Sequence, residues 1–198
     1  MPIRLWPPAW VFRFRSTPAI LPRVMAKASS KLKSLYEGKH IKLVQRGTYE
    51  FASRKKTSGI VAIVAVNAKG KLILIEQFRP PVNARVIEIP AGLAGDLEGH
   101  ELEELADAAK RELLEETGYE ARDMKAVAEG PPSAGICDEV ITMFVARGLK
   151  KTGDAAGDGS EDITVHEVPV SRVAAFLKRK VKEGCLVDLK VYAALGFL

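Results

Sequence analysis

Residues 59–78, GIVAIVAVNAKGKLILIEQF, contain two nearly continuous apolar runs that are rich in β-branched side chains. A turn at Asn67–Gly70 joins the two runs. A strand with one face in water alternates apolar and polar residues, whereas a strand covered on both faces is apolar throughout. The two runs therefore predict strands buried inside a sheet, which helices must cover on both sides.

Other segments predict the elements around these strands. Apolar and polar residues alternate around Gly47 in residues 40–55, as in a β-hairpin. Further strands are predicted at residues 85–89 (stopped by Pro90), 124–130, 139–149 and 162–170. Helices are predicted at about 100–117 and within 171–184 and 186–198, with Ser171 as N-cap of the second. The order predicts an α/β (α+β) fold with a mixed sheet between helices.

Residues 111–118, RELLEETG, place Glu112, Glu115 and Glu116 on one face of the first predicted helix. Like charges at this spacing repel by about a few tenths of a kcal/mol per pair. The apolar stripe that would anchor the helix is Leu102, Leu105, Ala109 and Leu113, with Gly118 as its C-terminal cap. The three glutamates are either a solvated acidic face or a site for a hard divalent cation, which prefers oxygen ligands.

The wider string, residues 90–119, resembles the Nudix hydrolase signature. That signature is Gly, five residues, Glu, seven residues, Arg-Glu, an apolar residue, any residue, Glu-Glu, any residue, Gly and an apolar residue. Residues 111–119 match its C-terminal half in full, and seven residues separate Glu103 from Arg111. Ten residues, not five, separate Gly92 from Glu103, which indicates a five-residue insertion at about 95–99.

The resemblance implies a Nudix-like α/β/α sandwich with a mixed sheet, and hydrolysis of a diphosphate linked to another group. It implies Mg²⁺ as cofactor, with Mn²⁺ as the alternative. Glu112 and Glu116 would bind the metal directly, Glu115 directly or through water, and the Ala91 carbonyl would complete the site. Glu115 and Glu116 would thereby take part in catalysis.

The resemblance gives Arg111 a structural role. It would pair with Glu103 and orient the helix. The alternative is a surface ion pair, which contributes about 0–1 kcal/mol.

Flanking segments narrow the resemblance to the ADP-ribose and nucleoside diphosphate sugar pyrophosphatases, from about Leu35 to the C-terminus. The segments are residues 35–44, 76–93, 130–139 and 160–169. This subfamily would release a nucleoside monophosphate and a sugar phosphate. Two alternatives stay open: a Nudix enzyme for nucleoside triphosphates, coenzyme A or dinucleotides, and a Nudix-fold binding module without catalysis.

Several residues are candidates for substrate contact. Arg79 offers a planar fork that matches phosphate oxygens. Glu88 would face the site from the strand before the signature, and Glu139 would contact metal or substrate. The resemblance implies that Tyr49 or Phe51 stacks on the nucleobase from a partner subunit in a homodimer; the alternative is that both belong to the core of the hairpin. Residues 53–56 are expected to form a solvated face.

The resemblance implies a general base on the loop before the late strand, which here is the acidic, glycine-rich loop at residues 150–163. Glu161 is the first choice because it lies just before the strand predicted at 162–170, and Asp158 is the second. A mobile loop that closes over the diphosphate could position the attacking water. The alternative is a flexible solvated loop without a catalytic role.

The net charge of +5 comes from the N-terminus. Residues 1–36 hold seven Lys and Arg and no acid, which leaves 23 basic and 25 acidic residues elsewhere, so no nucleic-acid surface is expected. We divide the chain into a basic extension (1–34), a β-hairpin subdomain (35–56) and a Nudix domain (57–198).

No membrane association is expected, because arginines interrupt the apolar runs of the extension. The extension is either an organellar transit peptide or a segment ahead of a start at Met25, and a cytoplasmic location is expected. Cys137 and Cys185 are expected to be free thiols.

Overall fold

The computed structural model describes residues 31–96, 99, 101–155 and 162–198. Three helices lie in this part of the chain: α1 (Leu105–Thr117), α2 (Val173–Lys182) and α3 (Leu189–Ala194). The strands are β1 (Lys33–Glu37), β2 (Ile41–Arg46), β3 (Tyr49–Arg54), β4 (Gly59–Ala65), β5 (Lys71–Arg79), β6 (Ala84–Glu88), β7 (Ala91–Ala94), β8 (Tyr119–Glu120), β9 (Asp123–Gly130), β10 (Ile141–Arg147), β11 (Lys150–Lys151), β12 (Thr164–Pro169) and β13 (Leu186–Val187).

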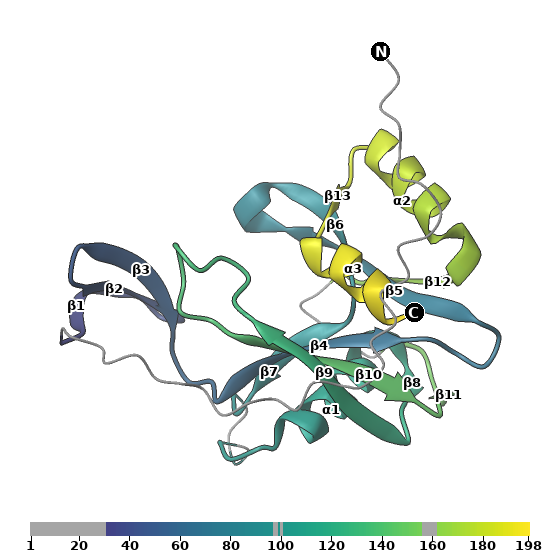
Figure 1. The fold of residues 1–198 in the computed structure, drawn as a ribbon, viewed down its shortest axis with the longest axis horizontal. Helices are drawn as coiled ribbons and strands as arrows, with labels where there is room; N and C mark the ends of the chain where they lie inside the picture. Colours follow the sequence, from purple (N-terminus) through teal and green to yellow (C-terminus); the bar gives the residue numbers. More distant parts are fainter. Residues whose placement is uncertain (1–30, 97–98, 100, 156–161) are drawn as a thin grey trace.

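Two four-stranded sheets form the centre of the molecule, in the orders β7-β4-β10-β9 and β12-β5-β6-β13. Both sheets are mixed, because β4 runs parallel to β10 and β6 runs parallel to β13, while the other pairs are antiparallel. Figure 1 shows α1 on one side of the strands and α2 and α3 on the other. The predicted α/β/α sandwich with mixed sheets is confirmed.

Strand β4 is apolar throughout because both of its faces are covered. Val61, Ile63 and Ala65 pack with Ala108, Ala109 and Leu113 of α1. Ala62 and Val64 belong to the opposite cluster, which includes Val173 and Leu177 of α2 and Val191 of α3. Every one of these side chains is less than 5% exposed. The helices therefore bury the apolar run of β4, as the sequence predicted. In the second run Leu72, Ile73, Leu74 and Ile75 are also buried, whereas Phe78 is 46% exposed.

A small antiparallel sheet, β1-β2-β3, lies beside this body (Figure 1). Its β2–β3 hairpin confirms the prediction for residues 40–55, and β1 adds a strand that the sequence analysis did not predict. The backbone of Ala52 on β3 donates to the Ile136 carbonyl at 2.8 Å and accepts from the Asp138 amide at 3.3 Å. The small sheet is thus joined to the loop before β10. The domain boundary at residue 57 remains a prediction.

The structure corrects the predicted starts of α1 and α2. Helix α1 begins at Leu105, not near residue 100, and Leu102 is 95% exposed, so it does not belong to the apolar stripe. A 3₁₀ turn at Val170–Arg172 precedes α2, so Ser171 does not cap that helix. Gly118 ends α1 with a φ of 70°, as predicted. A Cβ atom there would also lie 2.2 Å from the Gly153 carbonyl oxygen, which only glycine avoids.

Residues 186–187 form β13 rather than the start of the last predicted helix. Asp188 then caps α3, its side chain accepting from the Lys190 amide at 2.7 Å. No helix among the described residues is long and apolar enough to cross a membrane. Cys137 and Cys185 are free, as expected.

Under α2 lies a buried ion cluster that the sequence did not predict. The Glu76 carboxylate is bonded to Arg85 Nε at 2.8 Å, Lys180 Nζ at 2.8 Å and His166 Nε2 at 2.9 Å. Burial alone would raise the pKa of Glu76, but hydrogen bonds from Lys180, His166 and Arg85 outweigh it and lower this pKa to about 2. The cluster joins β5, β6, β12 and α2.

This pKa predicts an acid-sensitive contribution to stability. Because the pKa of Glu76 falls on folding from its ordinary 4.5 to about 2, the stabilisation is complete above pH 4.5 and is lost as the pH falls toward 2. We expect Glu76→Gln to lower the free energy of unfolding at pH 7 and to lose less of it than the wild type on acidification. Urea denaturation at several pH values tests this, and parallel pH profiles for the two proteins would contradict it.

Candidate active site

A single cleft of about 860 Å³ contains most of the site residues predicted from the sequence. It is bordered by α1, β7, the end of β5, β6, the loop before β10 and residues 186–190. The predicted residues that line it are Arg79, Glu88, Ala91, Glu112, Glu115, Glu116 and Glu139. Residues from seven separate positions in the sequence therefore share one cavity.

Helix α1 places the three glutamates at this cleft. Ala108, Ala109 and Leu113 are fully buried against β4 and fix the rotation of the helix. Glu116 is only 5% exposed, and its Oε2 accepts from the Ala91 amide at 3.0 Å. Strand β7 and helix α1 are thus connected inside the cleft.

Gly92 on β7 allows α1 to approach closely. A Cβ atom at this position would lie 1.9 Å from the carboxyl carbon of Glu112 and 2.2 Å from each of its oxygens. Burial raises the pKa of Glu112, while the Arg111 guanidinium acts against this effect. The first glycine of the signature therefore makes room for a buried carboxylate.

We expect Gly92→Ala to reduce kcat at least about tenfold, because Glu112 must leave its position and a displaced catalytic group is costly. The fold should survive, since Glu112 can rotate toward the cleft. Steady-state kinetics with a circular-dichroism melt tests this. Gly130→Ala is the matched control, since a Cβ atom at Gly130 meets nothing within 4 Å. Equal kcat values for the two variants would contradict the interpretation.

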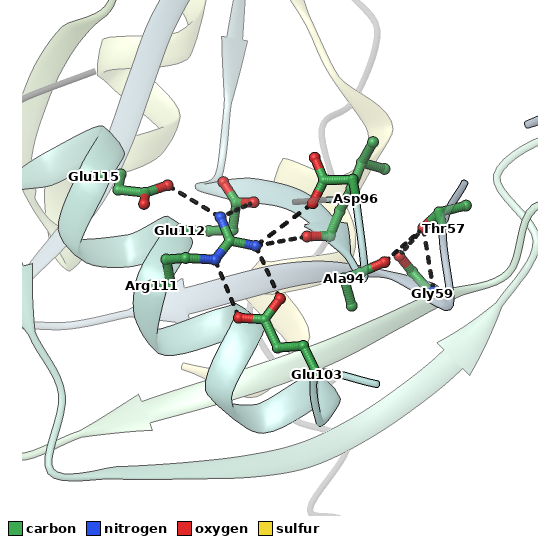
Figure 2. Close-up of polar contacts among 9 residues, drawn as sticks. Thr57, Gly59, Ala94, Asp96, Glu103, Arg111, Glu112 and Glu115 are labelled. Atoms are coloured by element: carbon green, nitrogen blue, oxygen red, sulfur yellow. Dashed lines mark hydrogen bonds and ion pairs between the residues drawn. The ribbon is translucent and has the colours of Figure 1, made fainter. Parts of the chain in front are cut away.

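Arg111 is the centre of the polar network in Figure 2. Its Nε and NH2 donate to the two oxygens of Glu103 at 3.1 Å each, and NH2 also donates to the Leu93 carbonyl at 2.8 Å. Its NH1 donates to Glu112 at 2.9 Å and Glu115 at 3.1 Å. Hydrogen bonding to Glu103 holds the pKa of Arg111 above its ordinary value. The predicted pairing of Arg111 with Glu103 is confirmed, and it ties α1 to the preceding loop.

The carboxylates suit a hard divalent cation by type but do not converge on one point. Among the residues that the structure describes, no three His, Cys, Asp or Glu side chains are grouped closely enough to hold a metal ion. Glu112 and Glu115 face the Arg111 cation, and Glu116 faces the Ala91 amide. All three line the same cleft as Ala91. The predicted ligand roles stay predictions.

Two ion pairs lie elsewhere in the cleft. Arg79 makes a bidentate pair with Glu88, at 2.6 Å from Nε to Oε1 and 2.8 Å from NH2 to Oε2. Arg54 Nε donates to Glu139 Oε1 at 2.9 Å. Arg54 is exposed, as expected for the solvated face at residues 53–56, but it also lines the cleft from β3. No local sequence pattern identifies Arg54 as a site residue, because its partner Glu139 is 85 residues away.

Tyr49 and Phe51 do not line the cleft of their own chain. Tyr49 is 68% exposed, so it is not part of a hairpin core. Phe51 is half-buried, with the Arg46 guanidinium 5.7 Å from its ring centroid. Their predicted contact with a nucleobase would require a second subunit and stays a prediction. Glu161 and Asp158, the predicted general bases, lie outside the described residues.

Comparison with known proteins defines the class. Residues 56–188 match the family model described as the NUDIX domain, so the chain belongs to the Nudix family and is a Nudix hydrolase, as the sequence predicted. It is 42% identical over 144 residues to an ADP-ribose pyrophosphatase of Bacillus subtilis, covering 72% of this chain and 73% of that protein.

One further relative and one solved structure are also similar to this chain. The chain is 31% identical over 186 residues to a methanol dehydrogenase activator of Bacillus methanolicus, covering 89% of this chain and 94% of that protein. A crystal structure titled as an ADP compounds hydrolase has the same fold, with a TM-score of 0.59 at 19% identity, covering 75% of this chain and 80% of that one.

Proposed function

We propose that this protein is a divalent-metal-dependent pyrophosphatase that hydrolyses ADP-ribose or related nucleoside diphosphate sugars. The products would be a nucleoside monophosphate and a sugar phosphate. The observation that supports this best is one cleft that combines the complete set Glu112, Glu115 and Glu116 with Arg54 and Arg79. Carboxylates suit a metal, and the arginines suit the diphosphate.

In this proposal the residues of the cleft have separate roles in metal binding, substrate binding and catalysis. Glu112 and Glu116 would hold Mg²⁺ or Mn²⁺, with Glu115 and the Ala91 carbonyl as further oxygen donors. When bound, the metal would neutralise the diphosphate and polarise the attacking water. Arg79 would orient the diphosphate, and Glu139 would contact substrate or metal. Glu161 remains our choice for the general base, with Asp158 as the alternative.

The substrate class is supported by the similarity to the ADP-ribose pyrophosphatase and by the resemblance of the flanking segments. The intact glutamate set argues against a binding module without catalysis. Product analysis with ADP-ribose, ADP-glucose and GDP-mannose, each with Mg²⁺, Mn²⁺ or EDTA, tests the proposal. Metal-dependent release of a nucleoside monophosphate is expected. Hydrolysis confined to nucleoside triphosphates, coenzyme A or dinucleotides would overturn the substrate class.

We further propose that the protein is a homodimer and that β1-β2-β3 contributes to the interface. By the register of this sheet Tyr36, Ile41 and Leu43 lie on one face, and each is at least 40% exposed. A contiguous exposed apolar face favours association with a partner. Light scattering at micromolar concentration should give the mass of a dimer, and a monomeric mass would refute the proposal.

The aromatic contact is tested separately with Tyr49→Ala. Because Tyr49 is 68% exposed, this change should leave the melting temperature nearly unchanged. If Tyr49 stacks on the nucleobase of the partner's substrate, KM should rise about tenfold. Phe51→Ala is the comparison, since Phe51 is half-buried and should lower stability. An unchanged KM in Tyr49→Ala would remove this residue from the site.

A further inference from the structure

Gln77 on β5 carries a buried hydrogen-bond donor that is not used. The residue is 3% exposed, and its Nε2 has no partner among the residues that the structure describes. No other buried side-chain nitrogen or oxygen in that part of the chain lacks a partner. A buried donor without an acceptor destabilises the folded state, whereas an apolar side chain of the same shape would not. Such a group calls for an explanation, and a partner that becomes available when a ligand binds is one.

Gln77 lies next to the Arg79–Glu88 ion pair. In the register of β5 and β6, Gln77 is opposite Val86, Ile75 is opposite Glu88, and Arg79 is opposite Ala84. These side chains share one face of the sheet, and Arg79, Val86 and Glu88 line the cleft. Glu88 is the diagonal neighbour of Gln77, for which Cβ atoms are typically about 7 Å apart. The unused donor is thus within side-chain reach of the Glu88 carboxylate.

Substrate would disturb this ion pair. Both oxygens of Glu88, a residue only 3% exposed, accept hydrogen bonds from Arg79. If Arg79 turns its fork toward a diphosphate, the carboxylate loses these bonds while it remains buried. A buried carboxylate without a donor is strongly unfavourable, so an anion that draws Arg79 away from both of these bonds leaves Glu88 in need of a replacement donor.

We propose that Gln77 is a positioning residue. Its side-chain amide donates a hydrogen bond to Glu88 in place of Arg79 when Arg79 binds the diphosphate. This inference rests on the proposed function. A neutral amide suits the task, because it donates to the carboxylate without competing with Arg79 for the anion. A lysine at this position would instead pair with Glu88 in the free protein as well, so its donors would already be in use before substrate binds.

The first test compares Gln77→Met with the wild type. We expect the melting temperature of the free variant to stay equal or to rise, because an unpaired buried amide is removed. We expect its Kd for ADP-ribose, measured by calorimetry in EDTA, to increase about tenfold, because Glu88 loses its replacement donor. Gln77→Leu repeats the test if methionine does not fit. A lower melting temperature with unchanged Kd would show that Gln77 has only a structural role and would overturn the proposal.

A double-mutant cycle tests whether Gln77 acts through Glu88. The Glu88→Gln background has no carboxylate at residue 88 that needs a replacement donor. In this background Gln77→Met should no longer weaken the binding of ADP-ribose. The same tenfold loss of affinity in both backgrounds would mean that Gln77 contacts the ligand itself. The proposal that Gln77 replaces Arg79 as the donor to Glu88 would then be wrong. If the wild type binds and hydrolyses nucleotide sugars but Gln77→Met behaves identically, only this inference fails. If the wild type does neither, the proposed function fails and the inference fails with it.

Discussion

Replacing Glu116 by glutamine should lower kcat at least about 100-fold at saturating Mg²⁺, because metal activation contributes several kcal/mol to the rate. Glutamine keeps the size of the side chain and can still accept from the Ala91 amide, the contact that Glu116 makes at 3.0 Å. The change therefore removes the negative charge and little else. Steady-state kinetics with ADP-ribose at several Mg²⁺ concentrations measures the loss.

The control for this experiment lies on the same helix. Asp107 faces solvent, with a side chain 67% exposed and a weak ion pair to Lys110 at 3.4 Å. Asp107→Asn removes a charge from α1 away from the cleft and should leave kcat unchanged. If Glu116→Gln retains near-normal activity at saturating Mg²⁺, Glu116 is not a metal ligand. If both variants lose activity equally, the effect belongs to the charge of the helix rather than to the site.

Replacing Arg111 by methionine should lower the free energy of unfolding by about 3 kcal/mol. The guanidinium is 19% exposed, and it neutralises Glu103 and Glu112, whose side chains are 8% and 13% exposed. Without it, two buried carboxylates lie near each other with no cation between them. Methionine keeps the length of the stem, so lost packing adds little. Urea denaturation at pH 7 measures the difference.

Arg122 provides the comparison for Arg111. It pairs with Asp123 at 2.8 Å, but the two side chains are 76% and 56% exposed. An exposed pair contributes about 0–1 kcal/mol, so Arg122→Met should scarcely change the unfolding midpoint. A loss below about 1 kcal/mol in Arg111→Met would show that the network around Arg111 is no more than a surface ion pair.

The structure shows where sequence reasoning about the fold succeeds. The burial of β4 and β5, the β2–β3 hairpin and the cap at Gly118 follow from patterns within a few residues, and all are confirmed. The failures are at helix boundaries and in strands that were not predicted, such as β1 and β13. Leu102 fits the helical period but is 95% exposed, because α1 starts three residues later and only tertiary contact decides which turn is buried.

The sequence alone placed the three carboxylates on one face of α1, because the helical period expresses this arrangement. Its resemblance to the Nudix signature predicted the class and the pairing of Arg111 with Glu103, which lies before the helix. The tertiary structure alone decided which distant groups meet. It brings Arg54 to Glu139 across 85 positions, holds Arg79 on Glu88, and leaves no room beside Gly92 for more than a hydrogen. It also buries Gln77 without a partner among the described residues. Such contacts depend on the order and register of strands that are far apart in the sequence. Local sequence periodicity does not determine that order or register.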